Sequence, residues 1–80
     1  MDESVFKEVR QLAAETFQTE EKEVTADSSP DTLENWDSIQ HLNFVLALEA
    51  RFQIELSAED MEGARSIADA VRIVEARISR

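Results

Sequence analysis

The chain has 80 residues and no cysteine, and its 8 Lys and Arg residues against 18 Asp and Glu residues leave a net charge of -10. A chain of this length buries roughly 60% of its unfolded surface, so we expect a single domain over residues 1–80. The lack of cysteine excludes a disulfide framework and a thiolate zinc site. Because the first residues are acidic and no long apolar run occurs, we expect neither a signal peptide nor a membrane span, and a cytoplasmic location.

The distribution of charge limits the partners. Residues 1–40 contain three basic and eleven acidic residues, a net charge of -8, and residues 41–80 contain five basic and seven acidic residues, a net charge of -2. Nucleic acids and anionic membranes attract cationic proteins, so we expect neither as a partner. The acidic surface favours basic protein partners, or serves solubility alone.

The first segment has apolar residues at helical spacing. An N-terminal helix is predicted, with Asp2 as its N-cap, and it ends near Thr19. Its inward stripe consists of Val5, Val9, Leu12, Ala13 and Thr16, with Phe6 and Phe17 beside it.

The polar segment of residues 19–36 contains the only proline and few apolar residues. A loop of this length is longer than compact domains normally use. We therefore expect it to be functional or to be anchored in the core by Val24, Leu33 and Trp36.

A second helix is expected from Asp37 to about Arg51. Asp37 can cap it while the Gln40 side chain reaches back, as in a capping box. Its apolar residues occupy more than one stripe, which predicts contacts with several elements and therefore the central position in the bundle. These residues are Ile39, Leu42, Phe44, Val45, Leu46 and Leu48.

The C-terminal part is predicted to hold one short and one long helix. Phe52, Ile54 and Leu56 alternate as in a strand, but no partner strand is evident, so we expect an extended loop. A capping pattern at residues 57–60 opens a short helix that ends near Gly63, and a similar pattern at residues 66–69 opens a helix to the C-terminus. The expected fold is all-α: a four-helix bundle of three long helices and one short helix, with a long loop between the first two.

Catalysis by side chains of this chain is not expected. Ser38, His41 and Asp37 are the residue types of a hydrolytic triad, but one helix surface offers neither an oxyanion hole nor a substrate pocket. A calcium loop counted from Asp27 fails as well, because Thr32 replaces the required glycine and Ser38 the required glutamate. We therefore expect no catalytic residue and no metal site.

Ser38 is the residue with chemical interest, because its hydroxyl lies at the predicted start of the second helix. Free backbone N–H groups and the positive end of the helix dipole favour a phosphate ester at that place. The alternative is an ordinary first-turn serine.

Two stretches of sequence carry a resemblance to a known family. Residues 35–39 read Asn-Trp-Asp-Ser-Ile, and residues 48–56 read Leu-Glu-Ala-Arg-Phe-Gln-Ile-Glu-Leu. Together with a Val24-Thr25 step fourteen residues before Ser38, they resemble the acyl carrier protein family, whose members carry an Asp-Ser-Leu motif at the start of the second helix. The resemblance covers almost the whole chain.

The resemblance implies a non-enzymatic carrier that is monomeric. A phosphopantetheinyl transferase would join 4'-phosphopantetheine from CoA to Ser38, and the arm would hold an acyl or aminoacyl group as a thioester. The implied partners are this transferase, a loading ligase, and a downstream transferase or synthase of fatty acid or secondary metabolite biosynthesis. Partner recognition is expected around the serine, at Trp36, Asp37, Ile39, Leu42 and Glu49.

Departures from the family pattern indicate which kind of carrier to expect. Positions after the serine that are often acidic in carriers of fatty acid synthesis are Gln40, His41 and Asn43 here. We therefore expect a specialised carrier with its own partner set rather than the housekeeping one. The alternative from another class is an unmodified acidic helical module that binds a basic protein.

Overall fold

The computed structural model describes residues 2–78, which form four α-helices and one 3-10 turn and contain no strand. The elements are α1 (Glu3–Thr16), η1 (Glu21–Glu23), α2 (Ser38–Phe52), α3 (Ala58–Gly63) and α4 (Ile67–Ile78). The predicted all-α class, with three longer helices, one short helix and a long loop between α1 and α2, is confirmed. The expected continuation of the last helix to Arg80 lies outside the described residues.

Helix α1 begins where its cap predicts. The Asp2 carboxylate accepts hydrogen bonds from the backbone N–H groups of Ser4, at 2.9 Å, and Val5, at 3.3 Å. These bonds satisfy donors that have no partner within the helix. The predicted apolar stripe faces inward, and Val9 and Ala13 on it are fully buried.

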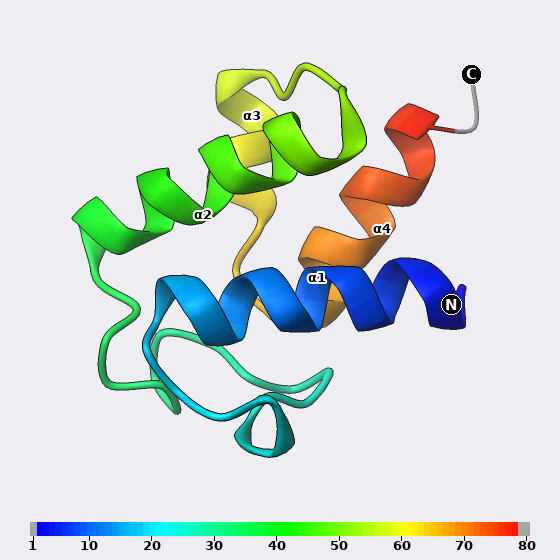
Figure 1. Cartoon of the computed structure of the whole chain (residues 1–80). Helices are drawn as coiled ribbons and strands as arrows, with labels where there is room; N and C mark the ends of the chain where they lie inside the picture. Colours follow the sequence, from blue (N-terminus) through cyan, green and yellow to red (C-terminus); the bar gives the residue numbers. More distant parts are fainter. Residues whose placement is uncertain (1, 79–80) are drawn as a thin grey trace.

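Among the described elements, helix α1, and not α2, makes the most extensive packing contacts. It packs against α2, α4 and η1. In Figure 1, α1 runs below α2, with α4 beside it and the long loop beneath it. The expectation that α2 is central is therefore wrong: α2 turns only part of its apolar surface inward and leaves Ile39, Leu42 and Leu46 exposed.

The long loop is anchored in the core, as predicted. Val24, Leu33 and Trp36 are all buried. The backbone also ties the loop to the start of α4, because the N–H groups of Ile67 and Ala68 donate to the carbonyls of Ser28 and Ala26, both at 3.0 Å. The loop therefore holds a defined path, and the 3-10 turn η1 within it was not predicted.

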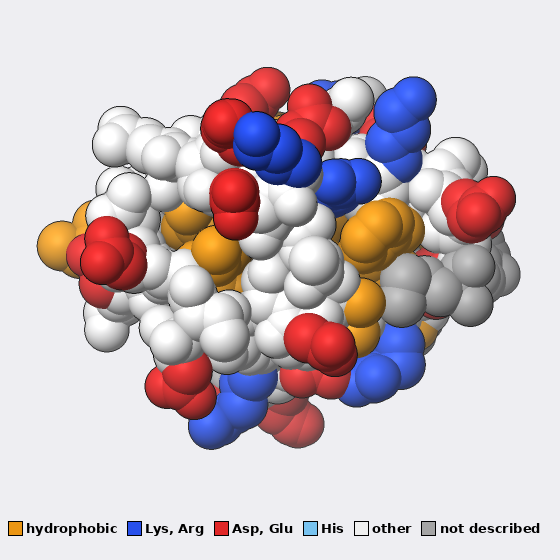
Figure 2. All heavy atoms as spheres, turned by 90° about the horizontal axis from the view of Figure 1, so that it is seen from below, with side chains coloured by type: hydrophobic (Ala, Val, Ile, Leu, Met, Phe, Trp, Pro, Cys, Tyr) orange, Lys and Arg blue, Asp and Glu red, His pale blue; other side chains and the backbone are white. Residues whose placement is uncertain are grey.

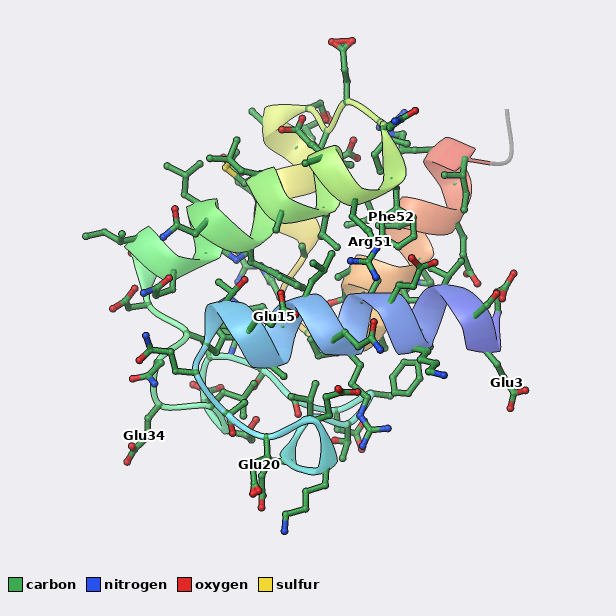
Figure 3. All side chains as sticks on the ribbon, in the orientation of Figure 1. Glu3, Glu15, Glu20, Glu34, Arg51 and Phe52 are labelled. Carbon is green, nitrogen blue, oxygen red and sulfur yellow. The ribbon has the colours of Figure 1, made fainter. Side chains whose placement is uncertain are left out.

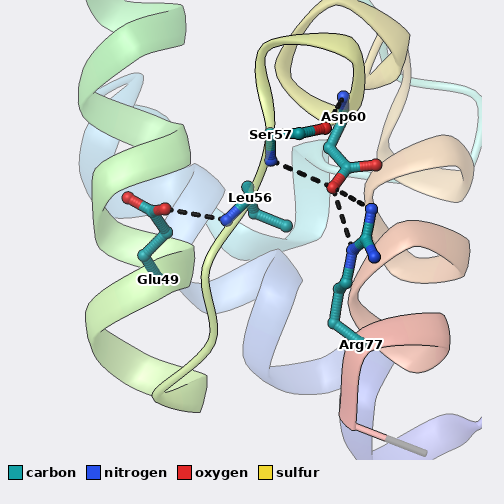
Figure 4. Close-up of polar contacts among 5 residues, drawn as sticks. All are labelled: Glu49, Leu56, Ser57, Asp60 and Arg77. Carbon is teal, nitrogen blue, oxygen red and sulfur yellow. Dashed lines mark hydrogen bonds and ion pairs between the residues drawn. The ribbon is translucent and has the colours of Figure 1, made fainter. Parts of the chain in front are cut away.

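The connection from α2 to α4 is held by polar contacts, drawn in Figure 4. A Glu49 carboxylate oxygen accepts a hydrogen bond from the Leu56 N–H at 2.8 Å. The predicted capping box at the start of α3 is confirmed, with Asp60 N to Ser57 Oγ at 3.0 Å and Ser57 N to Asp60 Oδ2 at 3.1 Å. Asp60 also accepts from Arg77 Nε at 2.9 Å, which joins α3 to α4.

The environment of Asp60 favours its charged form. Burial by itself would raise the pKa of this carboxyl, but the Ser57 backbone N–H and the Arg77 guanidinium outweigh it and lower the pKa below the usual value. Phe52, Ile54 and Leu56 pack partly buried against the core. Ile54 and Leu56 lie in a loop, as expected, but the expectation is wrong for Phe52, because helix α2 continues through it.

Charged side chains cover the outside of the bundle. Arg51 projects from α2 toward α1 (Figure 3), where its Nε lies 2.9 Å from Glu8 Oε1. Glu3, Glu20 and Glu34 point away from the bundle. The face that carries the long loop has acidic side chains around its rim, with Lys or Arg side chains beside several of them (Figure 2). Within residues 2–78, no helix is long and apolar enough to cross a membrane.

Candidate functional site

Ser38 is exposed and is the first residue of α2. Asp37 caps the helix, as predicted, and its Oδ1 accepts from the Gln40 N–H at 2.9 Å. The second half of the predicted capping box does not form. The Asp37 N–H donates instead to the Asn35 carbonyl at 3.0 Å, and the Gln40 Oε1 accepts from Asn43 Nδ2 at 3.1 Å. Because the tight turn before the helix already satisfies this N–H, Gln40 turns forward along α2.

His41 is half-buried, and both of its ring nitrogens are hydrogen-bonded. Trp36 Nε1 donates to His41 Nδ1 at 2.9 Å, and His41 Nε2 lies 2.7 Å from the Met61 carbonyl oxygen at the end of α3. An indole N–H can only donate, so Nδ1 accepts and the proton is on Nε2. The histidine thus connects the loop, α2 and α3, and neither nitrogen is directed to Ser38 or Asp37 as a triad would require.

Trp36 links Ser38 to the aromatic core. It is only 3% exposed, and its ring stacks on Phe17 with the centroids 4.7 Å apart. It also meets Phe44 edge-on, with the centroids 5.7 Å apart. Asn35, next to it, donates from Nδ2 to the Phe17 carbonyl at 2.8 Å, which fixes the end of the loop against α1.

An open cleft of about 510 Å³ lies beside Ser38, between the loop, the start of α2 and the segment that joins α3 to α4. Its volume is within the range of small-ligand sites. Three charged residues line it: Asp37 before α2, Glu62 in α3 and Arg65 between α3 and α4. Trp36 is its largest apolar lining residue. The lining residues are Pro30, Trp36, Asp37, Ser38, His41, Glu62, Ala64 and Arg65.

The structure places the sequence-predicted site residues in three different environments. Asp37, Ile39 and Leu42 are exposed beside Ser38, with Ile39 at 73% and Leu42 at 45%. Trp36 is buried and lines the cleft. Glu49 is half-buried, and its carboxylate holds the Leu56 N–H.

Sequence reasoning missed two features of this region. Leu46, which is 51% exposed, extends the apolar stripe of Ile39 and Leu42 along α2, and the helical spacing between these residues could have indicated it. Arg65, which lines the cleft, had no signal in the sequence, because only the path of the chain between α3 and α4 brings it to the same cleft as Ser38.

Comparison with known proteins agrees with this geometry. Residues 7–74 match the family described as phosphopantetheine attachment site. The chain is 33% identical over 75 residues to an acyl carrier protein of Prochlorococcus marinus (strain MIT 9515), covering 94% of each protein.

The chain belongs to the acyl carrier protein family.

The fold of this chain is also similar to that of a solved acyl carrier protein. The solution structure of the holo acyl carrier protein from Geobacter metallireducens superposes with a TM-score of 0.84 at 18% identity, covering 95% of this chain and 87% of that one. Members of the family are carriers without catalysis of their own, and their covalent cofactor is 4'-phosphopantetheine. This chain is therefore a phosphopantetheine-dependent carrier.

The residues at the start of α2 fit that cofactor. Ser38 is exposed, the first turn of α2 contains no acidic residue, and the cleft opens beside it. Free N–H groups at a helix start and the helix dipole stabilise the negative charge of a phosphodiester.

Proposed function

We propose that Ser38 is the attachment residue for 4'-phosphopantetheine, and that the chain carries an acyl or aminoacyl group as a thioester between partner enzymes. The observation that carries this proposal is the exposed position of Ser38 at the start of α2, within the part of the chain that matches the family. The cofactor supplies the thiol that the cysteine-free sequence lacks.

The role of Ser38 is that of a nucleophile toward CoA. Its Oγ forms a bond to the phosphorus that bears the pantetheine, the pyrophosphate bond of CoA breaks, and the nucleotide leaves. The hydroxyl proton passes to a base of the phosphopantetheinyl transferase, because both ring nitrogens of the nearby His41 are already hydrogen-bonded to Trp36 and Met61. The N–H groups at the start of α2 stabilise the resulting phosphodiester.

The partner surface in this proposal is an apolar stripe on α2 that begins directly after Ser38. It consists of Ile39, Leu42 and Leu46, which are 73%, 45% and 51% exposed. Exposed apolar side chains on one helix face contribute binding energy when a partner covers them. Asp37 borders the stripe and Trp36 contributes through the cleft, whereas recognition through Glu49 competes with its bond to Leu56.

The partners are a phosphopantetheinyl transferase, a loading ligase, and a downstream transferase or synthase. The neutral residues Gln40, His41 and Asn43 follow the serine, so docking on α2 depends more on apolar contact than on salt bridges. This favours a specialised carrier over one that serves general fatty acid synthesis. The proposal includes a single, monomeric domain over residues 1–80 and a cytoplasmic location.

The test is intact-protein mass spectrometry after incubation with CoA and a broad-specificity phosphopantetheinyl transferase. We expect one phosphopantetheine adduct on the wild type and none on Ser38→Ala. Ser57→Ala is the matched control, because it also removes a serine at a helix start, and it should retain the adduct. An unmodified wild type with several transferases would contradict the proposal and favour the unmodified interaction module.

A further inference from the structure

Trp36 separates the cleft beside Ser38 from the interior of the bundle. The residue lines the cleft, yet it is only 3% exposed. Behind it the ring stacks on Phe17 and meets Phe44 edge-on, and these two rings lie 5.2 Å from each other. The three aromatic side chains therefore fill the interior directly next to the attachment residue.

The indole is held in this position by a hydrogen-bond chain. Trp36 Nε1 donates to His41 Nδ1, and His41 Nε2 bonds to the Met61 carbonyl. Moving the indole aside would break its bond to His41 and its stacking on Phe17. A buried N–H without a partner carries a high free-energy cost, so the closed position is favoured.

The cleft itself gives a long alkyl chain no enclosed place. It is open, and its lining combines apolar residues, among them Pro30 and Ala64, with the charged residues Asp37, Glu62 and Arg65. An alkyl chain in an open cleft stays partly in contact with water, and it would also displace water from charged groups without pairing them. Short or polar groups lose less free energy by remaining in such a cleft.

We propose that Trp36, held by His41, closes the interior of the bundle to the cargo, so that this carrier transports short or polar acyl or aminoacyl groups outside the core. The inference rests on the proposed function, because it assumes that the cargo is attached through Ser38. Trp36 acts in it as a specificity-determining residue and His41 as its positioning residue.

The experiment loads Ser38 with acetyl-, hexanoyl- and dodecanoyl-phosphopantetheine from the corresponding acyl-CoA, with each product checked by intact mass. The readouts are the melting temperature and the emission of Trp36, the only tryptophan. Each methylene group that enters a core adds stability, so a buried dodecanoyl chain would raise the melting temperature by more than about 10 °C. We expect less than about 3 °C across the series and an unchanged emission maximum.

Variants test whether Trp36 is responsible. Trp36→Leu should open the interior and make the melting temperature increase with chain length, and His41→Ala should do so to a smaller degree while keeping the indole. Phe52→Leu is the matched control, since it removes a ring that packs against the core at the far end of α2, and its series should stay flat. If Trp36→Leu does not fold, the melting-temperature series of the wild type and of His41→Ala test the proposal.

The outcomes separate the two proposals. No mass increase on any acyl-CoA would overturn the proposed function, and this inference with it. Loading with a melting temperature that rises with chain length in the wild type would overturn this inference alone. A flat series in the wild type and in every folded variant of Trp36 or His41 would overturn the role of these residues.

Discussion

The indole nitrogen of Trp36 donates a hydrogen bond to His41 Nδ1 over 2.9 Å and joins the end of the long loop to the first turn of α2. His41→Ala removes this acceptor and leaves a buried N–H without a partner. We expect a loss of about 1–3 kcal/mol in the free energy of unfolding. Urea denaturation, followed by Trp36 emission, measures it.

The matched control for this variant is Asn43→Ala, on the exposed side of the same helix. It should change the free energy of unfolding by less than about 0.5 kcal/mol. Equal losses in the two variants would mean that the His41 hydrogen bonds do not stabilise the fold.

The lowered pKa of Asp60 predicts a dependence of stability on acid. The group is charged in the fold at a pH where the unfolded chain binds a proton, so its contribution is complete above the unfolded pKa, near 3.8, and is lost as the pH falls through the lower folded value. Asp60→Asn should therefore destabilise the protein at pH 7 and lessen the stability lost below pH 4. Glu59→Gln, an exposed neighbour, should leave the acid profile unchanged, and identical profiles for both variants would refute this assignment.

If the transferase binds the apolar stripe on α2, shortening a side chain of the stripe should slow phosphopantetheine transfer. Burial of the Leu42 side chain by the transferase should contribute on the order of 1.4 kcal/mol, so Leu42→Ala should lower kcat/KM for phosphopantetheine transfer about tenfold. The control is Ile78→Ala on α4, which removes a side chain that is also exposed, at 42%, but lies on another helix. A loss in both variants, or in neither, would argue against recognition through the stripe.

A variant of Glu49 tests whether this residue stabilises the fold or contacts a partner enzyme. Glu49→Gln keeps the size of the side chain but weakens the charge-assisted bond to the Leu56 N–H, and should cost about 1 kcal/mol of stability with little change in kcat/KM for the transferase. Glu55→Gln removes one exposed acid nearby and is the control. A fall in kcat/KM with unchanged stability would instead assign Glu49 to partner recognition.

The net charge of -10 predicts that screening stabilises the fold. We expect the melting temperature to rise between low and moderate NaCl, by about 4–8 °C for each kcal/mol gained. Asp31→Asn combined with Glu34→Gln removes two exposed acids of the loop and should raise the melting temperature at low salt while reducing its response to salt. A melting temperature that does not change with salt would exclude self-repulsion as a factor.

Local patterns in the sequence determined the helices and several of their ends. Apolar spacing placed α1, and the caps at Asp2, Asp37 and Ser57 were found from single residues, because a cap bonds to N–H groups two or three positions away. Its place after a cap made Ser38 of chemical interest, and the resemblance to the acyl carrier protein family made it the predicted attachment residue. The C-terminal ends of α1 and α2 were harder to predict from the sequence. Helices commonly end at a glycine in the left-handed conformation, but here Gln18 and Gln53 adopt it.

Only the tertiary structure decided which surfaces of these helices are buried against one another and which remain exposed. Gln40 lost its predicted bond because the Asn35 carbonyl competes for the same N–H. The apolar residues of α2 divide between the core and an exposed stripe because α1, and not α2, makes the most extensive contacts in the bundle. The contact of Trp36 with Phe17 and the cleft shared by Arg65 and Ser38 bring together residues distant in sequence. Such proximity depends on the path of the whole chain, which no local spacing encodes.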